Sequence, residues 1–435
     1  MSAAPQQMST GFFGRLKGLV GKERAEEIEI PVRGKASAWL PKSTKQIRVR
    51  KFDQPLLWVL IGLLAFGVVM VYSSSVALSP SGNFERYLSR HLIYLAISVT
   101  GMAIMLLIPI AFWEKVAPLL FIVSVIGLGV VLLIGHEVNG ARRWISFGPM
   151  QFQPSELAKF AVVIYASNYM MRKMEVKERF FRAVTPMAVA IGLMGALILA
   201  EPDMGAFMVI AIIAMGILFL GGVNGRMFFL IATVFLLAFA LMVGLSSWRR
   251  ERIFAYLDPW SADNVYGKGY QLTHALMALG RGEMFGVGLG ESMEKLKWLP
   301  EPHTDFLIAV IGEELGFIAV LVLIIAFFWI SRRMIYIGRQ AITLDRIFAG
   351  LAAQGVALWI GFQAFLNIGV SIGALPTKGL TLPLISYGGS ALLMNLAAIG
   401  LVLRIDLENR AMMRGESKRN TTKRNTTKRN GDKRK

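Results

Sequence analysis

Ten apolar stretches, each long enough to cross a lipid bilayer, constrain this chain more than any other feature of its sequence. A helix of about 17 to 25 mainly apolar residues spans the hydrocarbon core of a membrane. Over half of the 435 residues (55%) are hydrophobic, only 17% are charged, and the mean hydropathy is +0.54, values too apolar for a water-soluble protein of this length. The sequence therefore predicts an all-α polytopic membrane protein with ten transmembrane helices, at residues 55–77, 91–110, 117–135, 155–171, 184–200, 205–222, 227–246, 305–330, 348–372 and 388–403.

Lysine and arginine are concentrated at the two ends of the chain. Residues 1–51 hold 11 Lys or Arg against 4 Glu, and residues 404–435 hold 12 against 4 acidic residues. Basic segments beside membrane helices stay in the cytoplasm, so we expect both termini there. Residues 247–304, with seven residues of each sign, should form a large extracytoplasmic loop between helices 7 and 8. Within this loop, residues 269–279 show the apolar spacing of an amphipathic helix lying along the membrane surface.

The same charges define the expected domains. We predict a basic cytoplasmic extension at residues 1–51, a ten-helix membrane domain at residues 52–404, and a basic, disordered cytoplasmic tail at residues 405–435. A repeated basic tail could bind nucleic acid. Lys and Arg next to membrane helices, however, more often set orientation and contact anionic lipid headgroups. We therefore expect membrane lipids, and no nucleic acid, as partners.

Cofactor motifs are missing from the sequence. The chain has no cysteine and only 4 histidines, so it has no thiolate metal site, and its histidines lack the spacing of a helical zinc site. It also has no Gly-Lys-Ser or Gly-Lys-Thr phosphate loop. We predict no certain cofactor; a divalent cation held by carboxylates is left as an alternative, and no metal ligands are assigned.

An acidic residue stands where the eighth apolar stretch begins. Asp305 follows Thr304 at the end of the large loop, and Glu313 and Glu314 come later in the same stretch. Carboxylates in or beside a membrane helix are costly and usually face a water-filled cavity or a partner. A threonine followed by an acid is also an ordinary helix start. Both interpretations of Asp305 are open at this point.

A second polar segment links helices 3 and 4. Gly148-Pro149 predicts a turn between two short extended arms. Glu156 and Lys159, three residues apart on one helix face, can pair with each other or with another helix. Arg143, beside Trp144, is either a cation of the interfacial aromatic belt or a guanidinium that grips phosphate.

Two further turns carry polar residues. Asp203, in the short link between helices 5 and 6, could pair with Lys159 or could lie in a solvated turn. Residues 373–390 are too apolar for an open loop and too broken for a helix, a combination tolerated at membrane depth only where the backbone lines a cavity or is buried in protein. Lys378 would present a cation to that cavity. Under the expected topology these segments gather at the outer face.

Taken together, these motifs resemble the SEDS (shape, elongation, division and sporulation) family over roughly residues 50–410. The long basic N-terminal extension and the Arg404-Ile405-Asp406 ending are more similar to the cell-division branch than to the elongation branch. Two positions depart from the family pattern: Glu201 stands where glutamine is usual, and Pro302 lies inside its motif. The motifs that carry the resemblance are Gln153-Pro154-Ser155-Glu156-Leu157-Ala158-Lys159, Glu201-Pro202-Asp203-Met204-Gly205, Gly269-Tyr270-Gln271, Leu299-Pro300-Glu301-Pro302-His303-Thr304-Asp305-Phe306, Ile311-Gly312-Glu313-Glu314-Leu315-Gly316 and Leu375-Pro376-Thr377-Lys378-Gly379-Leu380-Thr381-Leu382-Pro383.

The resemblance implies a peptidoglycan glycosyltransferase that polymerises lipid II at the outer face of the cytoplasmic membrane, at the division septum. It also implies a class B penicillin-binding protein transpeptidase and other divisome membrane proteins as partners. Lipid II carries its own pyrophosphate leaving group, which agrees with the missing nucleotide loop.

The resemblance also implies that Asp305 is the catalytic acid, and general-base chemistry on an acceptor hydroxyl suits it. For the other residues we predict three supporting roles: pyrophosphate binding, completion of the substrate-binding cavity, and support of the helix that follows Asp305. Arg143 and Lys378 are predicted to bind the pyrophosphate, and Glu156, Lys159 and Asp203 to complete the cavity. His303, Glu313 and Glu314 are predicted to support the helix. For the two glutamates, orientation of the helix and binding of a cation are both open.

Three other functions fit parts of the pattern. A lipid II flippase would also need a polar cavity and broken helices. An elongation-type polymerase would share the same chemistry, and a non-catalytic divisome scaffold would use its loops only to recruit partners. The gathering of polar residues at one face favours the enzyme over the flippase, which needs polar groups accessible from both sides.

Overall fold

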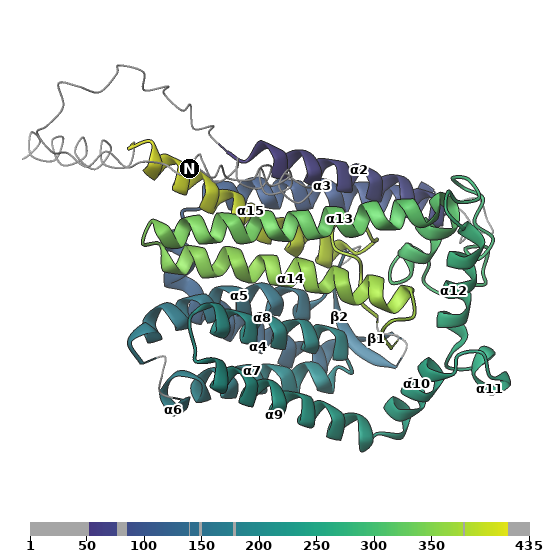
Figure 1. Ribbon diagram of the computed structural model, residues 1–435, viewed down its shortest axis with the longest axis horizontal. Helices are drawn as coiled ribbons and strands as arrows, with labels where there is room; N and C mark the ends of the chain where they lie inside the picture. The colour runs from purple at the N-terminus through teal and green to yellow at the C-terminus, as the bar shows by residue number, and fades with distance from the viewer. Residues whose placement is uncertain are drawn as a thin grey trace, which may run out of the picture. The chain divides into compact units, whose positions relative to one another are not determined.

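The chain folds into long helices that lie side by side, as a computed structural model describes for residues 52–75, 85–138, 140–147, 150–176, 180–376 and 379–415 (Figure 1). Each predicted apolar stretch coincides with one helix. The ten helices are α2 (Gln54–Ser75), α3 (Glu85–Leu107), α4 (Ile110–Ile134), α5 (Pro154–Lys173), α7 (Thr185–Ala200), α8 (Met204–Leu220), α9 (Gly225–Gly244), α13 (Leu307–Thr343), α14 (Ile347–Ser371) and α15 (Gly389–Met413).

Seven of the described helices are long and apolar enough to cross a membrane, judged by length and composition alone. The other three depart from that pattern for physical reasons. Helices α7 and α8 are apolar but only 16 and 17 residues long. Helix α5 carries buried polar side chains, including Glu156 and Lys159, and almost all of it is packed inside the protein.

Two helices run past the ends expected from hydropathy. Helix α13 continues to Thr343, and α15 continues to Met413, beyond the predicted start of the C-terminal tail. Charged residues do not end these helices because they find partners. The buried carboxylate of Asp53 pairs with Arg333 of α13 at 2.7 Å and with Arg410 of α15 at 3.1 Å. Hydropathy therefore marks only the apolar part of α13 and α15, whereas both helices continue to the ion pairs with Asp53.

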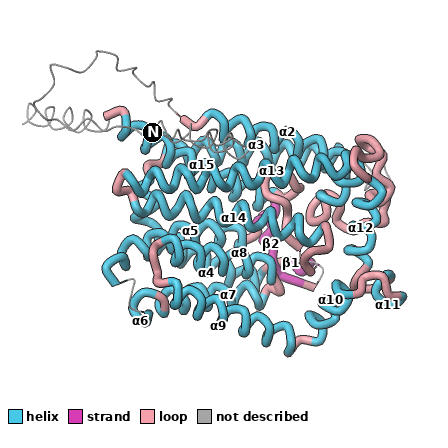
Figure 2. Tube along the Cα trace, viewed as in Figure 1, coloured by secondary structure: helices cyan, strands magenta, loops and turns pink. Residues whose placement is uncertain are grey.

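Three short strands lie between α4 and α5, so the prediction of an all-α protein is wrong in this detail (Figure 2). Strands β1 (His136–Val138), β2 (Ala141–Phe147) and β3 (Met150–Phe152) form an antiparallel sheet in the order β1-β2-β3. The two extended arms expected around Gly148-Pro149 are thus β2 and β3, and the turn residues themselves lie outside the described residues.

Short helices complete the connections. Helix η2 (Met174–Val176) and α6 (Phe180–Ala183) follow α5. The large loop contains α10 (Ser247–Leu257), α11 (Ala262–Val265) and α12 (Tyr270–Gly282). Helix α12 confirms the amphipathic helix expected at residues 269–279: Leu272, Ala275 and Ala278 are buried along one face.

Helix α13 is broken at Gly316, and the large loop fills the break. Gly316 has a positive φ of 78°. The backbone N–H groups of Val287 and Gly288 donate to the carbonyls of Glu313 and Glu314, both at 3.0 Å. Below the break, the N–H groups of Phe317 and Ile318 donate to the carbonyls of Glu283 (2.9 Å) and Met284 (3.3 Å). Loop residues therefore satisfy the backbone groups that the broken helix leaves unpaired.

Glycine permits this close approach of loop and helix. Gly286 has a φ of +81°, and a Cβ added there would lie 2.2 Å from the carbonyl oxygen of Glu314. A Cβ on Gly316 would lie 2.4 Å from the amide nitrogen of Gly286. Any larger side chain at either position must push the loop out of the break.

We predict that Gly286→Ala destabilises the protein more than Gly290→Ala does. Both glycines have positive φ, +81° and +90°, so both substitutions carry the left-handed penalty of about 1–2 kcal/mol, but a Cβ on Gly290 meets nothing within 4 Å. Thermal unfolding of the two variants in detergent checks this. Equal melting temperatures would show that contact with α13 does not decide the cost.

Candidate active site

Asp305 lies just before α13 and does not cap it. The N-cap position is Phe306, and no side chain caps this helix end. The interpretation of Asp305 as an ordinary helix start is therefore not supported. Instead, its backbone carbonyl accepts a hydrogen bond from Asn367 Nδ2 at 2.8 Å, and a Cβ on Gly379 would lie 3.0 Å from its Oδ2. The carboxylate thus faces the backbone of the segment that follows α14.

Charged neighbours and burial set the protonation of Asp305. Burial, and then the negative charges of Glu301 and Asp203, together raise its pKa to about 7, while Arg143 opposes this shift. Asp203 and Arg143 therefore lie within electrostatic reach of Asp305. The polar segments that the sequence places at one face do meet around this carboxylate.

Arg143 projects from β2 to the end of α7. Its Nε donates to the carbonyl of Glu201 at 2.9 Å, and its Nη2 donates to the carbonyl of Pro202 at 2.6 Å. A cation at the C-terminal end of a helix is favoured by the helix dipole. A guanidinium has five N–H donors, so these two bonds leave others directed elsewhere, and Arg143 is only partly buried.

Asp203 is buried, which rules out a solvated turn. Its Oδ1 caps α8 by accepting from the N–H of Ala206 at 3.0 Å. Its Oδ2 accepts from Gln153 Nε2 at 3.1 Å and from Ser155 Oγ at 3.4 Å. Asp203 therefore ties the start of α5 to the start of α8.

Of the two pairings left open for Lys159, the pair with Glu156 is confirmed and the pair with Asp203 is wrong. Lys159 is fully buried on α5, and its Nζ lies 2.8 Å from Glu156 Oε1 and 2.8 Å from Gln363 Oε1. Glu156 and Gln363 are the partners because Glu156 lies on α5 itself and Gln363 lies on α14, which packs against α5. The ammonium also lies 5.4 Å from the ring centroid of Trp359.

Two amides on α14 hold the segment around Asp305, and the sequence analysis missed both. Gln363 Nε2 donates to the carbonyl of Thr381 at 3.0 Å. Asn367 Nδ2 donates to the carbonyls of Asp305 (2.8 Å) and Leu380 (2.5 Å). The signal was available: two amide residues four apart lie on one face of an apolar stretch.

Glu201 is a buried acid without a counter-charge. It is fully buried, and neither carboxyl oxygen has a hydrogen-bond partner among the described residues. Burial, and then the charge of Asp203, raise its pKa to about 8, although Arg143 opposes this. A carboxyl with this pKa is protonated at neutral pH. It is then close in shape and charge to the glutamine that is usual at this position of the SEDS pattern.

Glu313 and Glu314 support the loop and the helix. The two oxygens of Glu313 accept from Arg281 Nη1 at 2.8 Å and from Ser292 Oγ at 2.5 Å. Glu314 pairs with Lys295 Nζ at 2.6 Å. Of the two roles left open by the sequence, orientation is therefore supported: protein donors already occupy both carboxylates.

His303 joins an aromatic cluster. Its ring lies 5.3 Å from the ring of Tyr87 and 5.4 Å from that of Tyr387, measured between centroids. Burial lowers the pKa of His303, against the opposing charge of Glu301. The neutral imidazole packs within this cluster. The backbone carbonyl of His303 also accepts from the N–H of Tyr387 at 2.9 Å, so ring and backbone together support the loop before Asp305.

The second predicted phosphate-binding cation, Lys378, lies outside the described residues. The structure adds another cation instead. Burial, and then the positive charge of Arg143, lower the pKa of Arg252 on α10, so the two guanidinium groups lie within electrostatic reach. The missed signal was the cluster of Arg249, Arg250 and Arg252, because basic residues are unusual on the side of the membrane that the sequence analysis expected for this loop.

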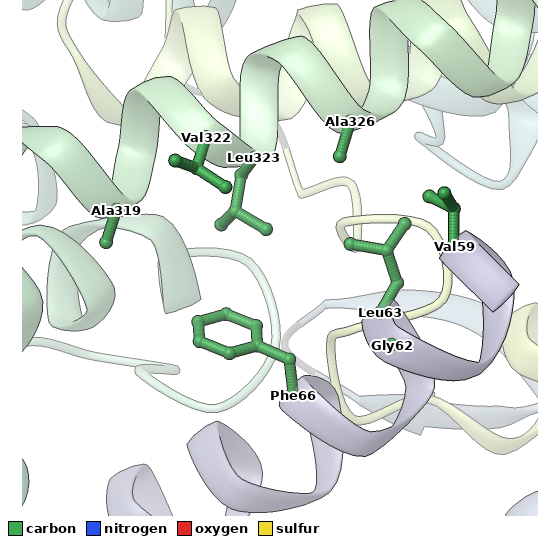
Figure 3. Close-up of a pocket in the computed structure, with 8 residues that line it drawn as sticks. All are labelled: Val59, Gly62, Leu63, Phe66, Ala319, Val322, Leu323 and Ala326. Carbon is green, nitrogen blue, oxygen red and sulfur yellow. The ribbon is translucent and has the colours of Figure 1, made fainter.

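Other features do not add to this chemistry. Within the described ranges, no three His, Cys, Asp or Glu side chains are grouped so that they could hold a metal ion. A groove of about 380 Å³ lies between α2 and α13, but its lining is apolar and includes Leu63, Phe66, Val322 and Leu323 (Figure 3).

We predict that Glu156→Gln lowers the free energy of unfolding by on the order of 3 kcal/mol, because it leaves the buried Lys159 charge without its counter-ion. Arg142→Ala is the control, since its pair with Glu137 is exposed and should contribute at most about 1 kcal/mol. Unfolding midpoints in detergent compare the two variants. A wild-type midpoint for Glu156→Gln would mean that the Lys159 charge is compensated elsewhere.

Comparison with known proteins shows the family of this chain. The FtsW/RodA/SpoVE family model, described as "Cell cycle protein", matches residues 54–411. A protein of Burkholderia thailandensis named "Probable peptidoglycan glycosyltransferase FtsW" is 56% identical over 375 residues, which cover 85% of this chain and 81% of that protein. A Thiomonas intermedia protein of the same name is 52% identical over 410 residues, 92% of this chain and 98% of its own.

Solved structures agree in fold. A chain from the work "Structural coordination of polymerization and crosslinking by a peptidoglycan synthase complex" has a TM-score of 0.67 and 27% identity, covering 82% of this chain and 98% of its own. The rod shape determining protein RodA of Thermus thermophilus has a TM-score of 0.61 and 27% identity, covering 83% and 97%. The relatives named FtsW confirm the expected similarity to the cell-division branch. The chain belongs to the FtsW/RodA/SpoVE family of cell cycle proteins.

Proposed function

We propose that the protein is a peptidoglycan glycosyltransferase that polymerises lipid II at the outer face of the cytoplasmic membrane during septal wall synthesis, with Asp305 as the general base. The observation that carries this proposal is the gathering of Arg143, Asp203 and Glu301 around a half-buried Asp305 whose pKa is about 7. The names of the relatives, peptidoglycan glycosyltransferase FtsW, supply the reaction class.

A carboxylate with this pKa suits proton removal from a sugar hydroxyl. Near neutral pH a large fraction of Asp305 is ionised and can accept a proton, and a raised pKa makes it a stronger base than an ordinary aspartate. In a single displacement the acceptor oxygen attacks the anomeric carbon of the donor, and the bond from that carbon to the pyrophosphate breaks. Asp305 takes the proton of the attacking hydroxyl, so one carboxylate is enough.

Positive charge near Asp305 suits the leaving group. The departing lipid pyrophosphate gains negative charge, and fixed cations in a poorly hydrated site stabilise it. Arg143 is held against the 201–202 turn by two hydrogen bonds, so it is oriented before substrate arrives. Arg252, within electrostatic reach of Arg143, and Lys378 are the other proposed pyrophosphate ligands. Glu156, Lys159 and Asp203 position α5, α8 and α14 around the cavity.

The topology and partners follow from the same proposal. All ten long helices cross the membrane, both termini are cytoplasmic, and residues 247–304 with Asp305 face outward, where lipid II is used. Support comes from the charge bias and from the coincidence of each apolar stretch with one helix. A class B penicillin-binding protein is the proposed transpeptidase partner, and a peptidoglycan synthase complex is the subject of one structural match.

We predict that Asp305→Asn reduces lipid II polymerisation by about 10²–10⁴-fold, the usual contribution of a general base, without changing the melting temperature appreciably. The measurement is glycan synthesis in proteoliposomes that contain the protein, its transpeptidase partner and purified lipid II. Asp263→Asn, at an exposed acid of the same loop, is the control and should keep wild-type activity.

Two outcomes would contradict the proposal. Undiminished glycan synthesis by Asp305→Asn would remove the general-base role. Loss of lipid II translocation in the same proteoliposomes, with polymerisation intact, would favour a flippase instead.

We predict that polymerisation rises with pH through about 7 and is level above it, because the active form of Asp305 is the carboxylate and its pKa is raised to about 7. Glu301→Gln removes a negative charge that raises this pKa, so the midpoint of the kcat/KM profile should move to lower pH. Initial rates between pH 5.5 and pH 9 measure the shift. An unchanged midpoint in Glu301→Gln would assign the titration to another group.

A further inference from the structure

Residues 284–289 of the large loop carry apolar side chains that point away from the protein. Phe285 is 80% exposed, Leu289 is 56% exposed and Met284 is 53% exposed. The same backbone fills the break in α13, where Met284 accepts from Ile318 and Val287 donates to Glu313. Exposure of such large apolar side chains to water is unfavourable, and the backbone that carries them is fixed against an apolar helix.

We propose that residues 284–289 insert into the outer leaflet of the membrane, where the side chains of Met284, Phe285 and Leu289 contact lipid acyl chains. This segment would then be a shallow membrane anchor of the large loop. The expectation from the sequence was a loop outside the cytoplasm, with residues 269–279 along the membrane surface and no inserted segment. The insertion is argued from helix geometry and from exposure. Its assignment to the outer leaflet rests on the proposed topology, and the insertion does not depend on the catalytic role of Asp305.

Helix α13 gives the depth of the segment. Arg333 of α13 pairs with Asp53, and these charges mark the polar boundary at the cytoplasmic end. Ile318 lies 15 residues before Arg333, or about 22 Å along a helix that rises 1.5 Å per residue. The hydrocarbon core is about 30 Å thick. Ile318, and with it the carbonyl of Met284, therefore lies inside the outer leaflet.

Helix α2 gives the same depth independently. Ser73 lies 20 residues after Asp53, or about 30 Å further along the helix, which places it at the outer boundary of the core. Ser73 Oγ donates to Glu314 at 2.7–2.8 Å. Glu314 is therefore at the boundary, and the break at Gly316 and the two residues after it lie just below.

The neighbouring surface is apolar and faces the same environment. Phe317 and Ile318, whose N–H groups bond to the segment, have side chains that are themselves exposed. The groove between α2 and α13 continues this surface along α13 from Ala319, with Phe66 and Val322 on facing sides (Figure 3). The exposed loop side chains thus extend a surface that belongs to membrane-crossing helices.

The segment also meets the polar requirements of a lipid environment. Backbone groups in hydrocarbon must bond within the protein, and the hydrogen bonds across the break provide this. The nearby acids are neutralised, Glu313 by Arg281 and Glu314 by Lys295. Exposed acids at residues 283 and 291 flank the apolar run, which keeps the insertion shallow. Such an anchor would hold Asp305 close to the headgroup level, a consequence that rests on the proposed function.

The absence of cysteine from the chain allows a direct test. Phe285→Cys and, separately, Met284→Cys are labelled with a nitroxide in the otherwise unchanged full-length protein, reconstituted in lipid nanodiscs without any partner. Oxygen concentrates in hydrocarbon, and a neutral nickel chelate stays in water. We expect the ratio of oxygen to nickel collision rates at both positions to be several-fold higher than at Tyr266→Cys, an exposed site in the connection between α11 and α12.

Phe328→Cys, at an exposed position further along α13, is the matched lipid-facing control. Ratios at 284 and 285 that equal the Tyr266 value would overturn the proposal, because the segment would lie in water. Low collision rates with both reagents would also overturn it, since a second protein copy would then cover the segment. Either variant alone decides the question if the other fails to fold.

Discussion

The side-chain amide of Asn367 is the interaction on which the geometry of the site depends most directly. One NH₂ group donates to the backbone of Asp305 and to the backbone of Leu380, and so joins the end of the large loop to the segment after α14. Gly379 can then lie against the Asp305 carboxylate. One turn earlier on α14, Gln363 ties the same segment to the buried Lys159. A rigid, buried helix face therefore positions a carboxylate that itself lies in irregular backbone.

Five of the acids described above differ in whether a cation contacts them. Glu156, Glu313 and Glu314 have cationic partners within 2.8 Å. Each negative charge is therefore neutralised by a neighbouring cation, and the ion pair stabilises the local structure. Glu201 and Asp305 have no such contact, and burial raises the pKa of each, to about 8 and about 7. The paired acids build the structure, whereas the unpaired ones keep a proton available near neutral pH.

Much of the helical framework could be predicted because apolar length has a direct physical meaning. Each of the ten stretches is a helix, and Asp305, Arg143 and Asp203 do gather. Pairing could not be predicted in the same way. Glu156 and Asp203 were both possible partners of Lys159, and the packing of α5 against α14 supplies Gln363, and not Asp203, as the second partner beside Glu156. The break at Gly316 was equally hidden, because the two acids before it and the apolar residues after it are compatible with one continuous helix, and the hydrogen-bond partners at the break lie in the large loop. Asn367 and Gln363 were visible as amides in an apolar stretch, but their targets are backbone carbonyls, which no sequence pattern marks.

The filled break in α13 bears on how this region moves. Val287 and Gly288 bond to one side of the break, and Phe317 and Ile318 bond from the other. In an ordinary surface loop, water replaces such bonds one at a time and the loop frays. Here the glycine contacts leave no room for water between the two backbones, so the hydrogen bonds must be lost together. The loop and the upper part of α13 therefore form one cooperative unit, and the segment that ends at Asp305 detaches as a whole or stays in place.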